Sequence, residues 1–192
     1  MHTMPRVPPF DRPATYDDLV ALPEPLVAEI VDGELHASPR PAIRHARAAS
    51  LLGSQLLPPM WEGRGGPGGW WILDEPELHL HADILVPDLA GWRRSRLPRL
   101  PDGAFFTNAP DWVCEVLSPS TAALDRAKKL AIYAREAVLH AWLVDPLAQT
   151  LEVLLLEGSR WSILATHVGH ESVRVAPFEH VEIPLSLLFG DD

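Results

Sequence analysis

The sequence predicts an α/β (α+β) protein with a mixed β-sheet core flanked by helices. Strand-like runs precede, alternate with and follow two helical segments. Turn signals at Asp32-Gly33 and at Glu157-Gly158-Ser159 each join two such runs, which predicts an N-terminal and a C-terminal β-hairpin. The chain has 192 residues and no internal repeat. We therefore expect a single domain over residues 15–192, preceded by a Pro-rich flexible segment over residues 1–14.

The first half of the chain begins with a short helix signal. Thr15 is a typical N-cap residue, and Asp18 stands three residues further on. After the first hairpin, the spacing predicts a helix from about Pro41 to Leu57, which Pro58-Pro59 should stop.

An extended stretch, residues 72–92, comes next. Within it Glu77, His79, His81 and Asp83 alternate with apolar residues, which predicts one polar face of a strand. Such a row could bind a metal, but a solvated strand face is the favoured interpretation, because soluble sheets commonly alternate in this way.

The second half opens with the nearly continuous apolar run of residues 109–118, which predicts a central strand. A helix over residues 120–137 follows, capped by Ser120 or Thr121. We then expect a strand ending at Asp145-Pro146, the second hairpin, and a tail with a strand and a short helix.

Composition narrows the function classes. The formal net charge is -10, which argues against a protein that binds nucleic acid through a large basic surface, although a small basic face would suffice. Cys114 is the only cysteine, and no apolar run approaches the length of a membrane span. We expect a cytoplasmic protein without a membrane segment or disulfide.

Three features in chain order suggest a metal site. Asp88 ends an apolar strand, Glu115 lies inside the next one, and Lys128-Lys129 follow on a helix. Two carboxylates on neighbouring strands can converge on one Mg²⁺, and a lysine can offset charge on a phosphate. Asp88 as a turn residue and Glu115 as the partner of an arginine are the alternatives.

The helix after Glu115 sets which lysine can serve such a site. Adjacent helical residues point about a hundred degrees apart, so at most one of Lys128 and Lys129 should face the carboxylates. Tyr133 shares the face of Lys129, and a half-buried helix position is the favoured interpretation for it. Arg126 is expected to pair with Asp125 or another acid.

Several segments together resemble the Uma-two family, whose members are restriction-endonuclease-like proteins of the PD-(D/E)XK nuclease superfamily. The resemblance spans about residues 16–189 and rests on five motifs: AEIVDGEL, PAIRH, VPDLAGW, the long run WVCEVLSPSTAALDRAKKLAIYAREAVLHAWLVDP, and IPLSLLF. It implies a restriction-endonuclease-like mixed sheet with the site at one edge. Where the superfamily carries a lysine two residues after the glutamate, this chain has Leu117.

The resemblance also implies roles for single residues. Asp88 and Glu115 match the acidic motif positions, and Lys129 best matches a lysine that has moved onto the following helix. Glu29 matches a further acidic position, with an exposed hairpin carboxylate as the alternative. His45 also falls on a family position, although a helix-surface or capping role is the favoured interpretation.

We therefore predict a Mg²⁺- or Mn²⁺-dependent endonuclease acting on nucleic acid, with DNA as the first candidate. Asp88, Glu115 and the backbone carbonyl of Val116 would hold the metal. The basic segment that contains Arg93, Arg94, Arg96 and Arg99 would guide the nucleic-acid backbone, although a solvated loop is the favoured interpretation of it. A homodimer is expected, because no separate sequence-reading module is visible. The alternative is a nuclease-fold protein that binds nucleic acid or a protein partner without cutting.

Overall fold

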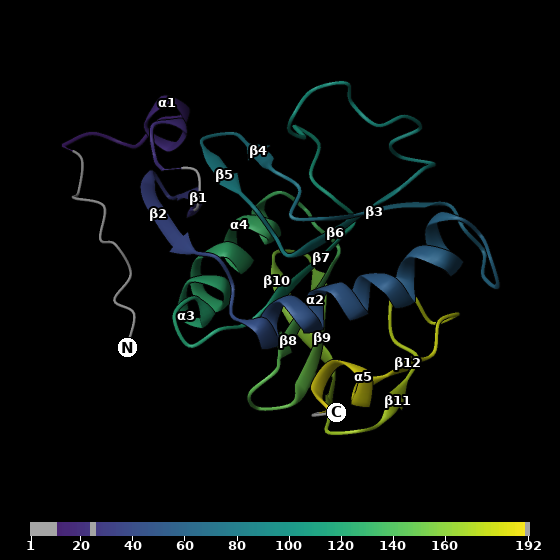
Figure 1. Cartoon of the computed structure of the whole chain (residues 1–192). Coiled ribbons are helices and arrows are strands. Elements are labelled where there is room, and N and C mark those ends of the chain that lie inside the picture. Colours follow the sequence, from purple (N-terminus) through teal and green to yellow (C-terminus); the bar gives the residue numbers. More distant parts are fainter. Residues whose placement is uncertain (1–10, 24–25, 191–192) are drawn as a thin grey trace.

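The computed structural model describes residues 11–23 and 26–190 (Figure 1). The sequence predicts a flexible segment over residues 1–14. Residues 1–10 of it lie outside the described residues. The predicted class is confirmed, since helices flank a mixed β-sheet. No helix in the described ranges is long and apolar enough to cross a membrane.

A six-stranded sheet forms the centre of the molecule. Its strands run in the order β10-β9-β8-β7-β6-β3. Their bounds are β3 Trp70–Asp74, β6 Leu89–Arg93, β7 Trp112–Val116, β8 His140–Asp145, β9 Thr150–Glu157 and β10 Arg160–Val168. Only β7 and β8 pair in parallel, so the sheet is mixed. β7 is buried along its whole length, which confirms the predicted central strand.

A second sheet packs at one end of the first and has the order β2-β1-β5-β4. Its strands are β1 Leu26–Val31, β2 Glu34–Pro39, β4 Leu78–Leu80 and β5 Asp83–Leu85. Asp32 and Gly33 both have positive φ, 51° and 77°, as the predicted hairpin turn requires. A two-stranded sheet joins β11 Ser172–Val173 to β12 Ile183–Pro184.

Helices cover both faces of the large sheet. On one face, α2 (Ile43–Leu56) and α5 (Leu185–Phe189) bury Leu52, Leu56 and Leu185 in one core with Trp112 and Trp142. On the other face, the helical segment α3 (Ala122–Leu124), η2 (Asp125–Lys129) and α4 (Leu130–Arg135) packs against the alternate side chains of β7 and β8. The short α1 (Tyr16–Val20) lies at the small sheet, and the backbone N–H of Thr15 donates to Asp18, as predicted for its cap.

Two predicted elements need correction. The polar row Glu77, His79, His81 and Asp83 does not share one strand face, because His81 turns the chain with a φ of 58°. β4 and β5 are therefore a hairpin, with Leu80 opposite Asp83. His81 is exposed at the turn, whereas Asp83 is buried and accepts from Arg135 at 2.6 Å. Local alternation cannot reveal a turn that lacks glycine and proline.

The second correction concerns the first long helix, whose α-helical part ends just before Pro58-Pro59 as predicted, although the helical path itself goes on. The α-helix ends at Leu56, but the chain continues as a π-helical turn, η1 (Leu57–Trp61). Prolines lack the N–H that closes an α-helical turn. The Glu62 N–H closes the wider turn instead, on the carbonyl of Leu57 at 3.2 Å.

Candidate active site

The strand pleat sets the direction of Glu115. Trp112, Cys114 and Val116 of β7 face α2, so Val113 and Glu115 face the α3–α4 side of the sheet. The chain returns after Ser118 into the helical segment that covers this side. Its π-helical turn η2 ends at Lys129, and only 2% of the surface of Lys129 is exposed. The predicted helix thus carries a buried lysine to a buried glutamate.

Lys129 is the centre of a group that we call the Lys129 cluster: Glu29, Glu115, Asp125, Lys129 and Tyr133. The Lys129 ammonium lies 2.9 Å from Oε1 of Glu115 and 2.8 Å from Oε1 of Glu29. Asp125 Oδ1 is 3.7 Å away, one helical turn earlier. The hydroxyl of Tyr133 donates to Glu115 Oε1 at 2.6 Å. Four separate contacts therefore hold one buried charge pair in place.

Glu29 reaches this group from the small sheet. Besides Lys129, its Oε1 accepts the backbone N–H of Val86 at 2.8 Å. Its side chain is only 14% exposed, so it is not the exposed hairpin carboxylate of the alternative interpretation. The contact with Lys129 therefore links the small sheet to the helical segment.

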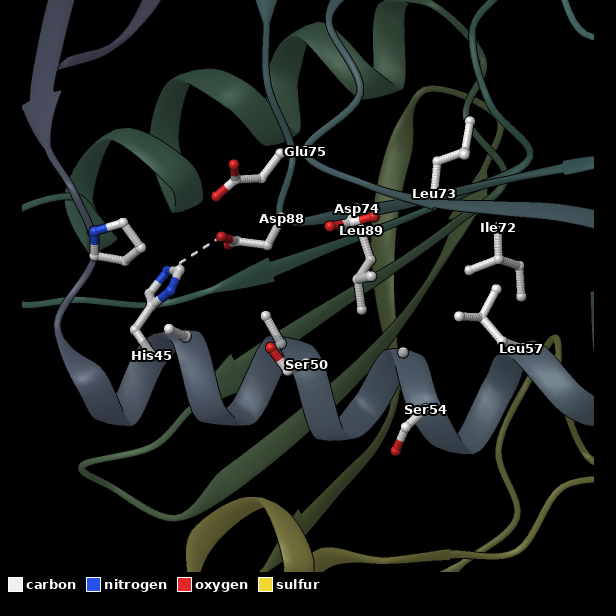
Figure 2. A pocket seen from close by; sticks show the side chains of 14 residues that line it. His45, Ser50, Ser54, Leu57, Ile72, Leu73, Asp74, Glu75, Asp88 and Leu89 are labelled. Atoms are coloured by element: carbon white, nitrogen blue, oxygen red, sulfur yellow. Dashed lines mark ion pairs between the residues drawn. The ribbon is translucent and has the colours of Figure 1, made fainter. Parts of the chain in front are cut away.

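Asp88 stands just before β6 and next to the Lys129 cluster. Its Oδ2 accepts the N–H of Val116 at 2.6 Å, which ties it to the end of β7. Its Oδ1 lies 3.2 Å from Nε2 of His45 (Figure 2). The His45 side chain is 13% exposed and points from α2 toward Asp88, so it is not a helix-surface residue.

Burial and charge shift the pKa values of this site. Burial raises the pKa of Glu115 well above its usual value; Lys129 opposes that shift, and Asp125, Asp88 and Glu29 add to it. Burial likewise raises the pKa of Asp125 to about 6. Burial lowers the pKa of Lys129, but the carboxylates of Glu115 and Glu29 outweigh it and raise that pKa well above the usual value.

Two neighbouring groups respond in the same way. Burial lowers the pKa of His45, but the hydrogen bond and charge of Asp88 more than offset it, so the net shift is upward. Burial, followed by the charge of Glu115, raises the pKa of the Tyr133 hydroxyl well above its usual value. Tyr133 therefore stays a hydrogen-bond donor to Glu115.

A cavity of about 360 Å³ opens beside Asp88. We call it the Asp88 cavity; α2 forms one wall, and the end of β3 and the start of β6 form the other (Figure 2). Asp88 and His45 line it, whereas Glu115 and Lys129 do not. Asp88 therefore lies between the buried Lys129 cluster and the open cavity.

Glu75 is a further acid at this cavity. It lies at a φ of 45°, uncommon for a residue other than glycine, and its N–H donates to the carbonyl of Asp88 at 3.1 Å. Figure 2 shows its side chain beside Asp88. No motif indicated Glu75, since its position depends on a turn after β3 that the sequence does not reveal.

The residues present fit a divalent cation by charge and donor type. No three His, Cys, Asp or Glu side chains in the described ranges are arranged as a preformed metal site. However, the negative charges of Glu29 and Asp88 both raise the pKa values of Glu115 and Asp125, with Lys129 and His45 as nearby basic groups. A hard cation that prefers carboxylate oxygens and retains waters would relieve this repulsion.

The predicted arginines lie elsewhere. Arg93 and Arg94 end and follow β6, at the opposite end of that strand from Asp88. Arg94 lies over the ring of Trp71 at 3.9 Å and donates to the Trp61 carbonyl at 2.9 Å. Arg96 pairs with Asp111 at 3.3 Å. The structure therefore does not bring this group together with the Lys129 cluster.

The remaining basic residues of the helical segment are accounted for. Lys128 pairs with Glu34 at 2.7 Å, away from Glu115, as expected for adjacent helical positions. Arg126 pairs with Glu152 at 2.7 Å, one of the acids that the sequence left open. Tyr133 is fully buried, which corrects the half-buried interpretation. The sequence signal that places Tyr133 in the cluster is its spacing of four residues after Lys129. Asp125 lies four residues before Lys129, so the same spacing places it in the cluster as well.

Comparison with known proteins agrees with this architecture. The crystal structure of a putative nuclease belonging to DUF820 from Anabaena variabilis ATCC 29413 is similar, with a TM-score of 0.70 and 25% sequence identity. The similarity covers 92% of this chain and 98% of that one. A search of curated proteins found no match.

A family model settles the resemblance that the motifs suggested. The model of Uma2, described as "Putative restriction endonuclease", matches residues 13–186. The match takes in both sheets, the Lys129 cluster and the Asp88 cavity. Because it extends over nearly the whole sequence, this chain belongs to the Uma2 family.

Proposed function

We propose that this protein is a Mg²⁺- or Mn²⁺-dependent endonuclease that hydrolyses phosphodiester bonds in nucleic acid, with DNA as the substrate to test first. One observation carries the proposal: Asp88, Glu115 and Lys129 converge from three separate segments, beside an open cavity. The family and the similar nuclease structure support the reaction class.

Asp88 and Glu115, with the carbonyl of Val116, would hold the cation. When bound, the cation supplies Lewis acidity and lowers the pKa of a water molecule. Val116 fixes Asp88 through its N–H, which leaves Oδ1 to face His45 and the cavity. Tyr133 and Lys129 orient the Glu115 carboxylate from the opposite side.

Lys129 acts through Glu115 in this proposal. Its ammonium has three N–H donors, and Glu115, Glu29 and the Val86 carbonyl at 3.4 Å occupy them. The positive charge favours ionised Glu115 in a buried setting, where an unpaired carboxylate is costly. Lys129 is therefore a positioning residue unless it exchanges these contacts for a phosphate.

The test is cleavage of labelled DNA by the purified protein with Mg²⁺, Mn²⁺ or EDTA. We expect metal-dependent cleavage that falls by about 10² or more in Asp88→Ala and in Glu115→Gln, because each change removes a proposed ligand. Lys128→Ala is the matched control and should cleave normally. Activity that persists in both acidic variants would instead point to a contaminant.

Binding without cleavage under every metal condition would favour the alternative, a nuclease-fold protein that only binds. The expected homodimer and a DNA substrate remain predictions. Light scattering during gel filtration measures the first, and parallel DNA and RNA substrates test the second.

A further inference from the structure

The Asp88 cavity has the size of a small organic ligand site, since such pockets begin at about 300 Å³. We propose that it receives an unpaired nucleobase of the nucleic-acid substrate, next to the phosphate that Asp88 serves. This proposal rests on the proposed nuclease function and names the form of its substrate.

The cavity exists because the facing wall of α2 carries little side-chain bulk. Ala46, Ala49 and Gly53 line this wall. Glycine in a helix interior costs about 1 kcal/mol relative to alanine, so a packing or functional reason is expected. Crowding is not the reason, because a Cβ at Gly53 would meet only Leu89 Cδ2, at an ordinary 3.6 Å. The missing side chain instead leaves room between α2 and the sheet.

The charges of the lining disfavour a phosphate as the occupant. Asp74, Glu75 and Asp88 line the cavity, no lysine or arginine is among the described residues that do, and the basic residue there, His45, already pairs with Asp88. Three carboxylates repel a phosphate group but accept hydrogen bonds from N–H donors. The occupant should therefore be a group that carries such donors and no negative charge.

A nucleobase combines the two surfaces that this lining matches. Leu57, Ile72 and Leu89 offer apolar contact to its flat faces, while Ser50 and the carboxylates offer partners to its edge. Adenine, cytosine and guanine carry exocyclic amino groups, whereas thymine presents carbonyl oxygens and a methyl group in their place. The cavity should therefore prefer amino-bearing bases over thymine.

A base inside an intact duplex cannot enter such a cavity. It must already be unpaired, or leave the stack at an energetic cost. Single-stranded or locally unpaired nucleic acid should therefore be the better substrate. The phosphate beside the bound base would then lie next to the cation that Asp88 holds.

The experiment is an abasic scan of a labelled single-stranded DNA of mixed sequence with the full-length protein and Mg²⁺. An abasic residue next to the cut should slow cleavage about tenfold, because the base contact is lost, and other positions should have little effect. A strand of dA should be cut faster than a strand of dT. Equal effects at every position would overturn the proposal.

Two variants that fill the cavity sharpen the result. Ser50→Trp and Ala46→Trp add bulk at exposed positions that line it, and both should abolish the position-dependent abasic effect and the dA preference. Ile43→Trp is the matched control, since Ile43 lies on the same helix, is 87% exposed and does not line the cavity. Unchanged selectivity in the two cavity variants would contradict the assignment.

The two proposals can fail separately. If the wild-type protein does not cut, the same scan is measured as binding by fluorescence anisotropy in Ca²⁺. If an abasic residue at one position weakens binding, and Ser50→Trp removes that effect, the cavity assignment is supported even though the nuclease activity is not. If duplex and single strand are cut equally and no abasic effect appears, the nuclease stands and the cavity assignment falls. A single strand that is neither cut nor bound overturns the cavity assignment as well.

Discussion

The Lys129 ammonium lies 2.9 Å from Glu115 Oε1, and each of these two residues exposes 2% of its surface. Such a pair is costly to break, because the remaining partner is left as an uncompensated buried charge. The neighbouring Lys128 pairs with Glu34 at the surface. This contrast between adjacent lysines underlies the first prediction.

Lys129→Met should lower the free energy of unfolding by about 3–5 kcal/mol at pH 7, because Glu115 and Glu29 lose their counter-charge. The cost should shrink as the pH falls, because burial raises the pKa of Glu115 and a protonated Glu115 needs no counter-charge. Lys128→Met should change stability by less than about 1 kcal/mol, as expected for a surface pair. Urea unfolding followed by circular dichroism measures both. Equal effects of the two variants would contradict the assigned burial.

Tyr133→Phe removes the hydroxyl that donates to Glu115 at 2.6 Å. We expect a loss of about 1–3 kcal/mol, because a buried carboxylate then lacks one hydrogen bond. Tyr16→Phe is the matched control among the two tyrosines and should cost clearly less, because the hydroxyl of Tyr16 interacts with Glu77 at an exposed position. The same unfolding experiment applies, and a neutral Tyr133→Phe would show that the hydrogen bond contributes nothing to stability.

Asp125 should make stability depend on pH. Its pKa is raised to about 6 in the folded chain, against an ordinary value of 3.8. The folded state therefore holds this proton more tightly, so its contribution favours folding below about pH 4, declines as the pH rises to about 6, and is constant above. Asp125→Asn removes that dependence.

The free energy of unfolding of Asp125→Asn minus that of the wild type should accordingly rise by about 3 kcal/mol between pH 4 and pH 7. Unfolding is measured in EDTA, so that no cation shifts the balance. A difference that stays constant with pH would show that Asp125 is not the titrating group.

We predict that the exposed arginine at the far end of β6 contributes through phosphate contacts. Arg93 is exposed, so Arg93→Ala should weaken DNA binding uniformly across sequences and reduce the salt slope by about 1. Arg94→Ala should lower stability more than Arg93→Ala, because the Arg94 guanidinium both packs over Trp71 and donates to the Trp61 carbonyl. Arg160→Ala, on the opposite edge strand, is the control. An unchanged salt slope in Arg93→Ala would remove it from the nucleic-acid path.

Local sequence signals determined much of the fold and part of the site. The turn at Asp32-Gly33, the apolar run of β7 and the capping residue Thr15 each depend on neighbours in the chain, and each prediction is confirmed. Helical spacing predicted that at most one of Lys128 and Lys129 faces the carboxylates and put Tyr133 on the Lys129 face, whereas the family resemblance selected Lys129. These features follow from backbone geometry, which repeats along the chain.

Only the tertiary structure decided which side chains meet. Glu29 reaches Lys129 because the small sheet packs over the end of the large one, and His45 reaches Asp88 because α2 lies across its other face. Packing between segments far apart in sequence also decides three other features. These are the turn at His81, the packing of Arg94 over Trp71 and the Asp88 cavity. Periodicity fixes the direction of a side chain on its own element, but the partner it finds depends on how the elements pack.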